Sequence, residues 1–412
     1  MNNQSTYDTM LVALDIGTTK ISVLVAQKVS DEGLTVIGIG KAPSYGVSRG
    51  VVVDIAQAVH SIKLAIKEAE LMAGCTIESV CIGISGVHVQ AFNSQGMIPI
   101  KNGRIRPHDV SSVLAAARAV VIPEGQQILH VLPQYYTIDN HHRVADPVGM
   151  FGVRLEAQVH IVTGAVASVQ NLVRACMTAG VEVSDIIFEP LASADAVLSP
   201  DEKQLGVALL DIGGGTSDFA IYQQGTIRHT KVFPIAGNLI THDIALCLRA
   251  TIKDAERVKQ EYGSTLRSLF RTSEQIEIEM VHGEETTMVS IDEIARIIEP
   301  RVSELLMMVH KEIEQGHLEN LMPAGIVLTG GGALLNGIKE TVQISLRVPA
   351  RVGNPHVPPM FKEVLSSPVY ATAYGLLLHT LKKNKGVALN ELSGPLMNRV
   401  FYRMKSWVAD FF

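Results

Sequence analysis

Two short turns carry the residue types that bind phosphate groups in proteins. The stretch "LVALDIGTTKISVLVA" begins at Leu11 and "VALLDIGGGTSDFAIY" begins at Val207, and each reads as a strand, a turn and a second strand. Glycine at such a turn accepts positive φ and lets backbone N–H groups approach an anion. Threonine hydroxyls add donors, and a lysine adds positive charge. The candidate phosphate-binding residues are Gly17, Thr18, Thr19, Lys20, Gly213, Gly214, Gly215 and Thr216.

An aspartate stands at the end of the first strand in each stretch, Asp15 in one and Asp211 in the other. A carboxylate does not bind phosphate directly, because like charges repel. Asp15 and Asp211 fit the site if a hydrated Mg²⁺ lies between them and the phosphates. Two such loops facing each other across a cleft would hold a nucleoside triphosphate from both sides.

A third glycine run lies in "GIVLTGGGALLNGI", which begins at Gly325. We expect it to follow an apolar strand and to open a helix, so that its backbone could approach a nucleotide closely. By contrast, "GIGKAPSYG" at Gly38 lacks the third glycine and the following helix of a dinucleotide-binding turn, and we interpret it as strand and turn. The residues of the third run are Gly330, Gly331 and Gly332.

Each of the two turns opens a longer repeat. A third strand ("LTVIGIGKAPS") and a helix ("AQAVHSIKLAIKEAELMA") follow the first turn, and "GTIRHTKVFPIAG" and "NLITHDIALCLRA" follow the second. Two unrelated hairpins would not share this order over so long a stretch. The pattern predicts an α/β fold with two duplicated β-β-β-α domains around a cleft.

Composition limits the remaining function classes. A chain of 412 residues with 47% hydrophobic residues is long enough for two domains with large buried sheets. The net charge of −6 argues against a nucleic-acid partner. We expect the four cysteines to be reduced core thiols of a cytosolic protein. The N-terminus lacks the pattern of a signal peptide, and no apolar run reaches the roughly 18 residues of a membrane span.

The three glycine runs together resemble the two phosphate motifs and the adenosine motif of the actin, Hsp70 and sugar-kinase superfamily. "EPLASADAVL" and "SPVYATAYGLLL" resemble its two hinge helices. Between them, "GRIRPHDVSSVLAAARAVVIPEGQQILHVLPQYYTID" and "ADPVGMFGVRLEAQVHIVTG" are similar to the inserted sub-domain of the bacterial FtsA family of cell-division proteins. An Hsp70 would have a long substrate-binding domain after its ATPase, and the sequence after Leu381 does not resemble one, so this member of the superfamily is not favoured. The alternative is a sugar kinase, but Asp109, Asp139 and Asp146 lie in no recognisable sugar-binding context, and Asp146 more plausibly caps a turn.

The resemblance implies an actin-like (ribonuclease H-like) fold that binds ATP and Mg²⁺ and forms filaments. It also implies a peripheral protein at the division septum, on the cytoplasmic face of the bacterial inner membrane. There it would anchor the FtsZ ring and help to recruit later divisome proteins. We expect a scaffold with at most slow ATP hydrolysis, because no residue stands out as the positioner of an attacking water, with Asp211 or Glu189 the nearest guesses.

By the same resemblance, two further groups of residues receive roles. Bacterial actins use a pattern similar to that of Glu256 and Lys259 to hold the ribose and adenine; the alternative is a solvated ion pair. The helix "SIDEIARIIEPRVSELLMMVHKEIEQ" corresponds to the region that receives the acidic C-terminal tail of FtsZ. An arginine suits this role because its fork can bind a carboxylate through two hydrogen bonds. The candidate partner-binding residues are Arg301, Glu304 and Arg296.

The end of the chain has a different pattern. Residues 382–394 read as a flexible linker, and residues 395–412 then place their bulky apolar residues in one arc of a helical wheel, with basic residues opposite. This predicts an interfacial helix that lies on an anionic membrane rather than a core-packing helix. The candidate membrane-binding residues are Leu396, Met397, Val400, Phe401, Met404, Trp407, Val408, Phe411 and Phe412.

These readings divide the chain as follows. The first domain comprises residues 1–84 and 164–204, with the inserted sub-domain at 85–163 between them. The second domain comprises residues 205–240 and 321–365, with a sub-domain at 241–320 that carries the adenine side and the FtsZ-tail site. The chain then ends with a hinge helix at 366–381, the linker at 382–394 and the membrane helix at 395–412.

Overall fold

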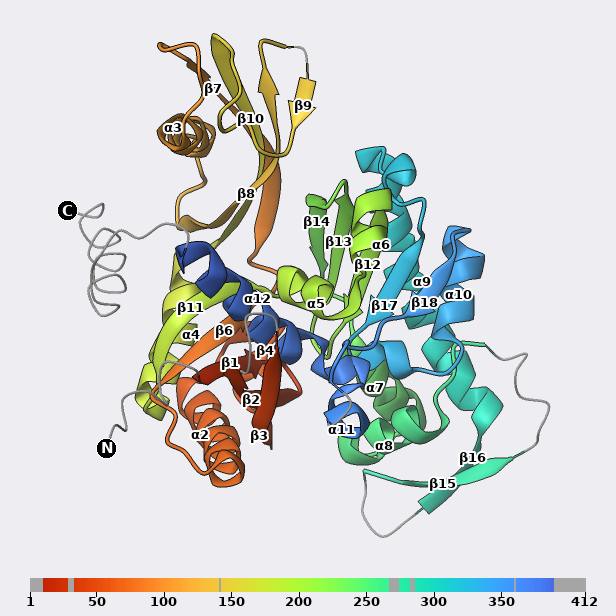
Figure 1. The fold of residues 1–412 in the computed structure, drawn as a ribbon. Coiled ribbons are helices and arrows are strands. Elements are labelled where there is room, and N and C mark those ends of the chain that lie inside the picture. Colours follow the sequence, from red (N-terminus) through yellow and green to blue (C-terminus); the bar gives the residue numbers. More distant parts are fainter. Residues whose placement is uncertain are drawn as a thin grey trace.

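The computed structural model of the chain describes residues 10–28, 33–140, 142–266, 274–281, 286–358 and 361–388. Two α/β domains lie beside each other, and a smaller sub-domain projects from the first of them (Figure 1). Two helices, α5 (Glu189–Val197) and α12 (Ala371–Ala388), lie between the domains. The predicted two-domain α/β architecture is confirmed.

The first domain is built on a five-stranded sheet with the order β11-β6-β1-β2-β3. β1, β2 and β3 pair antiparallel, whereas β1–β6 and β6–β11 pair parallel. Its strands are β1 (Met10–Ile16), β2 (Lys20–Lys28), β3 (Leu34–Pro43), β6 (Ser79–Ile84) and β11 (Glu182–Phe188); β4 (Val47–Ser48) and β5 (Val51–Val52) form a separate hairpin, and the domain's helices are α2 (Ile55–Ala73) and α4 (Val166–Ala179).

The second domain repeats this sheet with the order β14-β13-β12-β17-β18. The pairing repeats as well: β12, β13 and β14 are antiparallel, and β12–β17 and β17–β18 are parallel. The internal repeat of the sequence is therefore a repeat of topology. Its elements are α6 (Pro200–Leu205), β12 (Val207–Ile212), β13 (Ser217–Gln223), β14 (Thr226–Phe233), α7 (Gly237–Leu248), α8 (Ile252–Tyr262), β15 (Gln275–Glu279), β16 (Thr286–Ser290), α9 (Ile291–Gly316), β17 (Ile326–Thr329), α10 (Ile338–Leu346), β18 (Ala350–Val352) and α11 (Lys362–Leu365).

Alternate residues of each central strand serve two cores. In β1, Leu14 packs with α2 and α4, whereas Ala13 packs with α5 and α12; in β12, Leu210 packs with α7 and α9, whereas Leu209 joins Ala13. Strands buried on both faces need continuous apolar runs, which explains why both copies of the repeat are so hydrophobic. The core between the two sheets is shared, so α5 and α12 hold the domains together.

The glycines of "GIGKAPS" belong to β3 and serve packing. A Cβ on Gly40 would lie 1.9 Å from the carbonyl oxygen of Ala65, and one on Gly38 would lie 2.7 Å from that of Ala69, both on α2. The helix thus runs directly on the strand, and the interpretation of this stretch as a strand is confirmed.

The two helices between the domains cross at a similarly close contact. A Cβ on Gly375 of α12 would lie 1.8 Å from the carbonyl oxygen of Ala192 on α5. Only glycine permits this approach of the two backbones. The crossing lies next to Ser193, which contacts the candidate site described below.

The inserted sub-domain has a sheet of its own with the order β7-β10-β8-β9, covered by α3. It follows β6 and ends where β10 runs into α4. Proline at its first helical position and a reciprocal hydrogen bond between Asp109 and Arg106 start α3. Its elements are β7 (Gln90–Pro99), α3 (Pro107–Arg118), β8 (Gln126–Ile138), β9 (His142–Val144) and β10 (Arg154–Ala165).

A polar network joins the inserted sub-domain to β14 of the second domain. The ring of His160 contacts Asn93 Oδ1 through Nδ1 at 2.8 Å and Thr230 Oγ1 through Nε2 at 2.9 Å. Gln134 donates to Asn93 Oδ1 at 3.1 Å and to the carbonyl oxygen of Ile227 at 2.9 Å. Because His160, Gln134 and Thr230 are buried, the sub-domain is held on the second domain by hydrogen bonds that a wrong orientation would leave unsatisfied.

Acid should weaken this junction through His160. Burial, with a smaller contribution from the charge of His229, lowers the pKa of His160 to about 4. As the pH falls, the unfolded chain therefore binds the proton before the folded chain does. The free energy of unfolding is highest above about pH 6.5 and decreases as the pH falls toward 4, by a total on the order of 3 kcal/mol. We expect His160→Gln, which does not titrate, to flatten the decline in unfolding temperature over this range. An unchanged pH profile in His160→Gln would assign the acid sensitivity to other groups.

Of the two expectations about the C-terminal part, the start of the linker needs revision, and the membrane helix lies outside the described residues. α12 extends to Ala388, so residues 382–388 continue a helix rather than begin the predicted linker. The predicted membrane helix at 395–412 lies outside the described residues. In the part of the chain that the structure describes, no helix is both long enough and apolar enough to span a bilayer.

Candidate functional site

The two predicted phosphate loops have the same backbone geometry. In the first, the N–H of Gly17 donates to the carbonyl oxygen of Lys20 at 3.1 Å; in the second, the N–H of Gly213 donates to that of Thr216 at 3.0 Å. Each loop joins the first two strands of its sheet, so each follows an aspartate at the end of a central strand. The duplicated sequence thus builds the same anion-accessible turn twice.

The two loops meet between the domains. A Cβ on Gly214 would lie 2.4 Å from Thr19 Cγ2, and a Cβ on Gly215 would lie 2.3 Å from Thr18 Oγ1. Any side chain at either glycine would therefore push the first loop away. The structure brings Thr18, Thr19, Gly214 and Gly215 together as the sequence predicts, and glycine is needed in the second loop for the approach of the first.

Four carboxyl groups gather at the base of these loops. Burial, together with the neighbouring charge of Asp211, raises the pKa of Asp15 to about 6, with Lys20 acting in the opposite direction. Burial and the charge of Asp211 also raise the pKa of Asp218 to about 7. The pKa of Glu189, at the start of α5, is raised well above its usual value by burial and by the charges of the three aspartates. The cluster is short of positive charge.

Hydroxyl groups from both hinge helices hold Asp211. Ser193 of α5 donates to Asp211 Oδ2 at 2.6 Å, and Thr372 of α12 donates to the same oxygen at 3.3 Å. The two hydroxyls lie 3.0 Å from each other. Burial raises the pKa of Asp211, and these hydrogen bonds oppose the shift. The carboxylate is therefore oriented by the elements that join the domains.

Sequence reasoning missed Asp218, Ser85, Ser193 and Thr372. Asp218 lies in the quoted second stretch and pairs with Asp211 across the hairpin, where the first copy has Ser22 opposite Asp15. The hydroxyl of Ser85, after β6, donates to Asp218. The sequence signal for Asp218 was that the second copy of the repeat has this aspartate where the first copy has Ser22.

A hydrated magnesium ion fits this arrangement. Carboxylates whose pKa values are raised by burial and mutual repulsion gain from a nearby divalent cation. Among the described residues, no group of three or more His, Cys, Asp or Glu side chains has the arrangement to hold a metal ion directly. Asp15 and Asp211 are the residues that would hold such an ion, through its water shell.

Lys20 is placed differently from the expectation. Its ammonium group donates to the carbonyl oxygen of Val369 at 2.5 Å and lies 4.4 Å from the centre of the Tyr370 ring. Burial lowers the pKa of Lys20 to about 8, although Asp15 opposes this. The lysine is thus bound at the start of α12 rather than free to face a phosphate.

Glu256 and Lys259 connect α8 to the second phosphate loop. Lys259 Nζ lies 2.7 Å from Glu256 Oε2 and 3.2 Å from the carbonyl oxygen of Gly237. At the start of α7, the N–H of Gly237 donates to the carbonyl oxygen of Gly213 at 3.0 Å. The side chain of Lys259 is 13% exposed and that of Glu256 is 34% exposed, so the pair is partly buried beside the second loop.

The third glycine run lies beside Asp211. Gly330 has φ of +79°, and a Cβ there would lie 2.3 Å from Asp211 Oδ1. A Cβ on Gly332 would clash with Ile212, whereas one on Gly331 would meet nothing within 4 Å. Gly331–Leu334 form a 3₁₀ turn, and α10 begins only at Ile338, so the run does not open the helix directly as expected. Open backbone at Gly331 remains suited to a flat ligand.

The predicted partner residues line a separate pocket between α7 and α9. Arg301 forms two hydrogen bonds with Asp243, at 2.7 and 2.9 Å, and one with Glu304. The paired guanidinium donors that we expected to bind a carboxylate of a partner therefore already bind Asp243 of the same chain. Arg296 pairs with Asp292 at 2.8 Å. The pocket has a volume of about 400 Å³ and is lined by Asp243, Cys247, Arg296, Ile297, Pro300, Arg301 and Glu304.

The exposure of Cys247 in this pocket corrects the expectation that all four cysteines are core thiols. Cys81 and Cys176 are buried and Cys75 is half-buried, but Cys247 is exposed.

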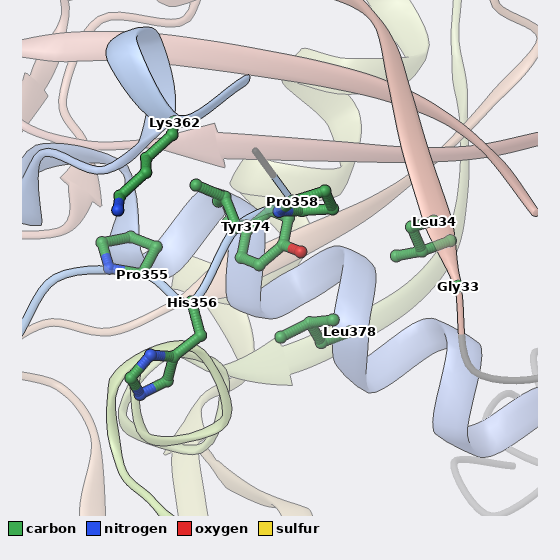
Figure 2. Close-up of a pocket in the computed structure, with 9 residues that line it drawn as sticks. Gly33, Leu34, Pro355, His356, Pro358, Lys362, Tyr374 and Leu378 are labelled. Atoms are coloured by element: carbon green, nitrogen blue, oxygen red, sulfur yellow. The ribbon is translucent and has the colours of Figure 1, made fainter. Parts of the chain in front are cut away.

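A larger cavity, of about 510 Å³, contains none of the predicted site residues (Figure 2). It lies between Leu34 at the start of β3, the segment around Pro355–Pro358, and Tyr374 and Leu378 of α12. Its lining is mixed, with His356 and Lys362 beside apolar side chains, and it has no cluster of acidic groups. The residues expected to bind a triphosphate lie at the glycine loops instead.

The three aspartates weighed for a sugar kinase all have structural roles in the inserted sub-domain. Asp109 caps α3, and Asp139 accepts hydrogen bonds from the N–H groups of Val153 and Arg154. Asp146 accepts from the N–H of Val148 at 2.9 Å, as expected of a turn cap. None of these carboxylates is part of the cluster at the phosphate loops.

Comparison with known proteins agrees with these features. A family model described as "Cell division protein FtsA" matches residues 208–375, and one described as "SHS2 domain inserted in FTSA" matches residues 86–163. Curated relatives called cell division protein FtsA include one from Pseudomonas aeruginosa, 44% identical over 98% of both chains. Another, from Escherichia coli K12, is 39% identical over 89% of both chains.

Solved structures place the fold among the actin-like proteins. The PilM–PilN type IV pilus biogenesis complex contains a chain that matches 90% of this one and 98% of its own length, with a TM-score of 0.66 and 20% identity. MreB5 of Spiroplasma citri bound to ADP matches 92% of this chain and 98% of its own, with a TM-score of 0.57 and 18% identity. The expected actin-like fold is confirmed, and the chain belongs to the FtsA family of actin-like cell-division proteins.

Proposed function

We propose that the chain is an ATP-binding scaffold that polymerises on the inner membrane and anchors the FtsZ ring to it at the division septum. The observation that carries this proposal is the meeting of Thr18 and Thr19 with Gly214 and Gly215, beside three buried aspartates and the half-buried Glu189. MreB5 structures bound to ADP and AMPPNP, with the same fold, support nucleotide as the ligand. ATP with Mg²⁺ held through water by Asp15 and Asp211 is the form we propose.

Within this proposal, each candidate group has a place. The two loops hold the phosphates, Glu256 and Lys259 hold the ribose and adenine side, and the open backbone at Gly331 lies beside the adenosine. ATP closes the cleft and sets the geometry of filaments of this chain, with at most slow hydrolysis. Help in recruiting later divisome membrane proteins, and attachment to anionic lipid through residues 395–412, complete the scaffold role.

The pocket between α7 and α9 is the site we propose for the acidic C-terminal tail of FtsZ. Its two arginines supply donors for carboxylates, and Ile297 and Pro300 supply apolar surface for the side chains between them. Because Arg301 already binds Asp243, a peptide carboxylate must replace Asp243 or use the remaining donors of the guanidinium group. Asp243 is thus an internal competitor for the peptide.

Two substitutions of opposite effect test this site. Arg301→Glu should weaken binding of a synthetic FtsZ tail peptide by about 2 kcal/mol or more, because it replaces a charge-assisted pair with repulsion. Asp243→Asn should tighten binding, because it releases the guanidinium group of Arg301. Affinities are measured by fluorescence anisotropy at two salt concentrations, since we expect charge-assisted binding to weaken with salt.

Lys311→Glu, an equal charge change at an exposed position of α9, is the matched control and should bind the peptide like the wild-type chain. Circular dichroism identifies variants that fail to fold. If Arg301→Glu and Asp243→Asn both fold and bind like the wild type, the FtsZ site lies elsewhere.

A further inference from the structure

The turn between β4 and β5 has an unusual composition. Its two central residues, Arg49 and Gly50, have φ of +48° and +75°. A turn of this kind favours Asn-Gly, because arginine, like other residues with a Cβ and a long side chain, is strained at positive φ. Such strain in a folded chain points to a use for the residue.

This turn is wedged between both phosphate loops and the end of β6. A Cβ on Gly215 would lie 3.0 Å from Arg49 Cα, and the same point is 2.3 Å from Thr18 Oγ1. On the other side, a Cβ on Gly50 would lie 2.3 Å from the carbonyl oxygen of Ser85, the residue whose hydroxyl binds Asp218. The backbone of Arg49 is therefore fixed where the two loops meet.

The side chain of Arg49 is exposed, and in the described part of the chain it makes no hydrogen bond, ion pair or ring contact. Lys20, the cation that the loop sequence offers, is instead held by Val369 and Tyr370. A nucleoside triphosphate remains strongly negative even with one divalent cation. Arg49 thus has an unpaired guanidinium group and a backbone that lies beside the proposed anion site, whose own lysine is engaged elsewhere.

The order of contacts along the second loop tells which phosphate Arg49 would meet. Gly213 is bonded to the start of α7, on the side of Lys259, whereas Gly215 packs against Thr18 and Arg49. A nucleotide with its adenosine on the α8 side therefore has its last phosphate at the Gly215 end. We infer that Arg49 binds the terminal phosphate of the triphosphate and so distinguishes it from the diphosphate; this inference rests on the nucleotide site proposed above.

The test compares ATP and ADP affinities of the full-length chain by titration calorimetry with Mg²⁺. Arg49→Gln keeps a polar side chain and removes the charge; we expect it to lose roughly tenfold or more in ATP affinity, with ADP affinity unchanged. Arg49→Lys should recover part of the loss, since an ammonium group is a point charge without the fork.

Arg49→Gly separates binding from backbone strain. Glycine accepts φ of +48° freely, so this variant should be at least as heat-stable as the wild type and yet lose the same preference for ATP. If Arg49 were only structural, Arg49→Gly would bind both nucleotides normally. An unchanged ratio of ATP to ADP affinity in Arg49→Gln and Arg49→Gly overturns this inference alone. Failure of the wild-type chain to bind ATP overturns the proposed site and this inference together.

Discussion

Asp15→Asn should make the nucleotide-free protein more stable and remove its Mg²⁺-dependent binding of ATP. The raised pKa of about 6 means that folding keeps the Asp15 carboxylate in an unfavourable environment above that pH. Neutralising the group should therefore raise the free energy of unfolding at pH 8 by on the order of 2–3 kcal/mol. The same change removes a negative charge that the hydrated ion needs, so ATP should no longer raise the unfolding temperature.

The pH dependence gives a second readout of the same carboxyl group. Because the folded chain binds the proton more tightly than the unfolded chain, stability without nucleotide falls as the pH rises from 3.8 toward about 6. Mg²⁺ must displace that proton, so binding of Mg-ATP should weaken as the pH drops below about 6. Asp15→Asn should flatten this part of the stability profile.

Asp201→Asn, at an exposed position in α6, is the matched control and should leave both stability and ATP binding unchanged. Differential scanning fluorimetry and calorimetry supply the measurements. A folded Asp15→Asn protein that binds Mg-ATP like the wild type, or that is no more stable than the wild type without nucleotide, contradicts the proposed role of the carboxylate cluster.

Trp407→Glu should release the protein from anionic vesicles. Trp407 is the only tryptophan of the chain and lies in the centre of the predicted apolar arc of residues 395–412, which the structure does not describe. A carboxylate there opposes both insertion and the attraction of Arg399, Arg403 and Lys405, worth about 1 kcal/mol each near an anionic surface. Co-sedimentation with vesicles should fall to the level of a chain that lacks residues 395–412.

Trp407→Phe keeps the apolar character and should still sediment with the vesicles. In the wild-type chain, vesicles should shift the tryptophan fluorescence to shorter wavelength, because the indole leaves water. Since one short helix binds weakly, filaments should attach more firmly than single molecules, through many simultaneous contacts. If vesicles leave the tryptophan spectrum of the wild-type chain unshifted, and deletion of residues 395–412 leaves the sedimentation unchanged, the tail does not bind membranes.

The repeat and its loops were predictable because their determinants are local. Gly213 and Asp211 are neighbours in sequence, and the apolar runs around them alternate with turns, so the strands, the turns and the duplicated fold follow from short stretches. The conformation of the third glycine run did not follow, because Gly330 is set by its contact with Asp211, which belongs to another strand.

The rest of the site depends on long-range topology. Ser193 and Thr372 reach Asp211 only because two helices far apart in the chain cross beside β12. Asp243 reaches Arg301 only because α7 packs on α9, and no spacing in the sequence signals that pair. The direction of the Lys20 side chain depends on the start of α12. Each is a side-chain partnership that the fold creates and that a linear pattern does not contain.

The crossing of Gly375 on Ala192 has a thermodynamic consequence. The two backbones that touch there also carry Thr372 and Ser193, whose hydroxyls bind the same oxygen of Asp211. In the proposed function, a change in the angle between the domains therefore changes the groups that face the bound cation. Cation binding then favours one interdomain angle over another by the same coupling free energy. In the filaments that we propose, nucleotide affinity and the shape that one subunit presents to the next would then be coupled in one equilibrium, and a neighbour that prefers one shape would act as an effector of the distant site.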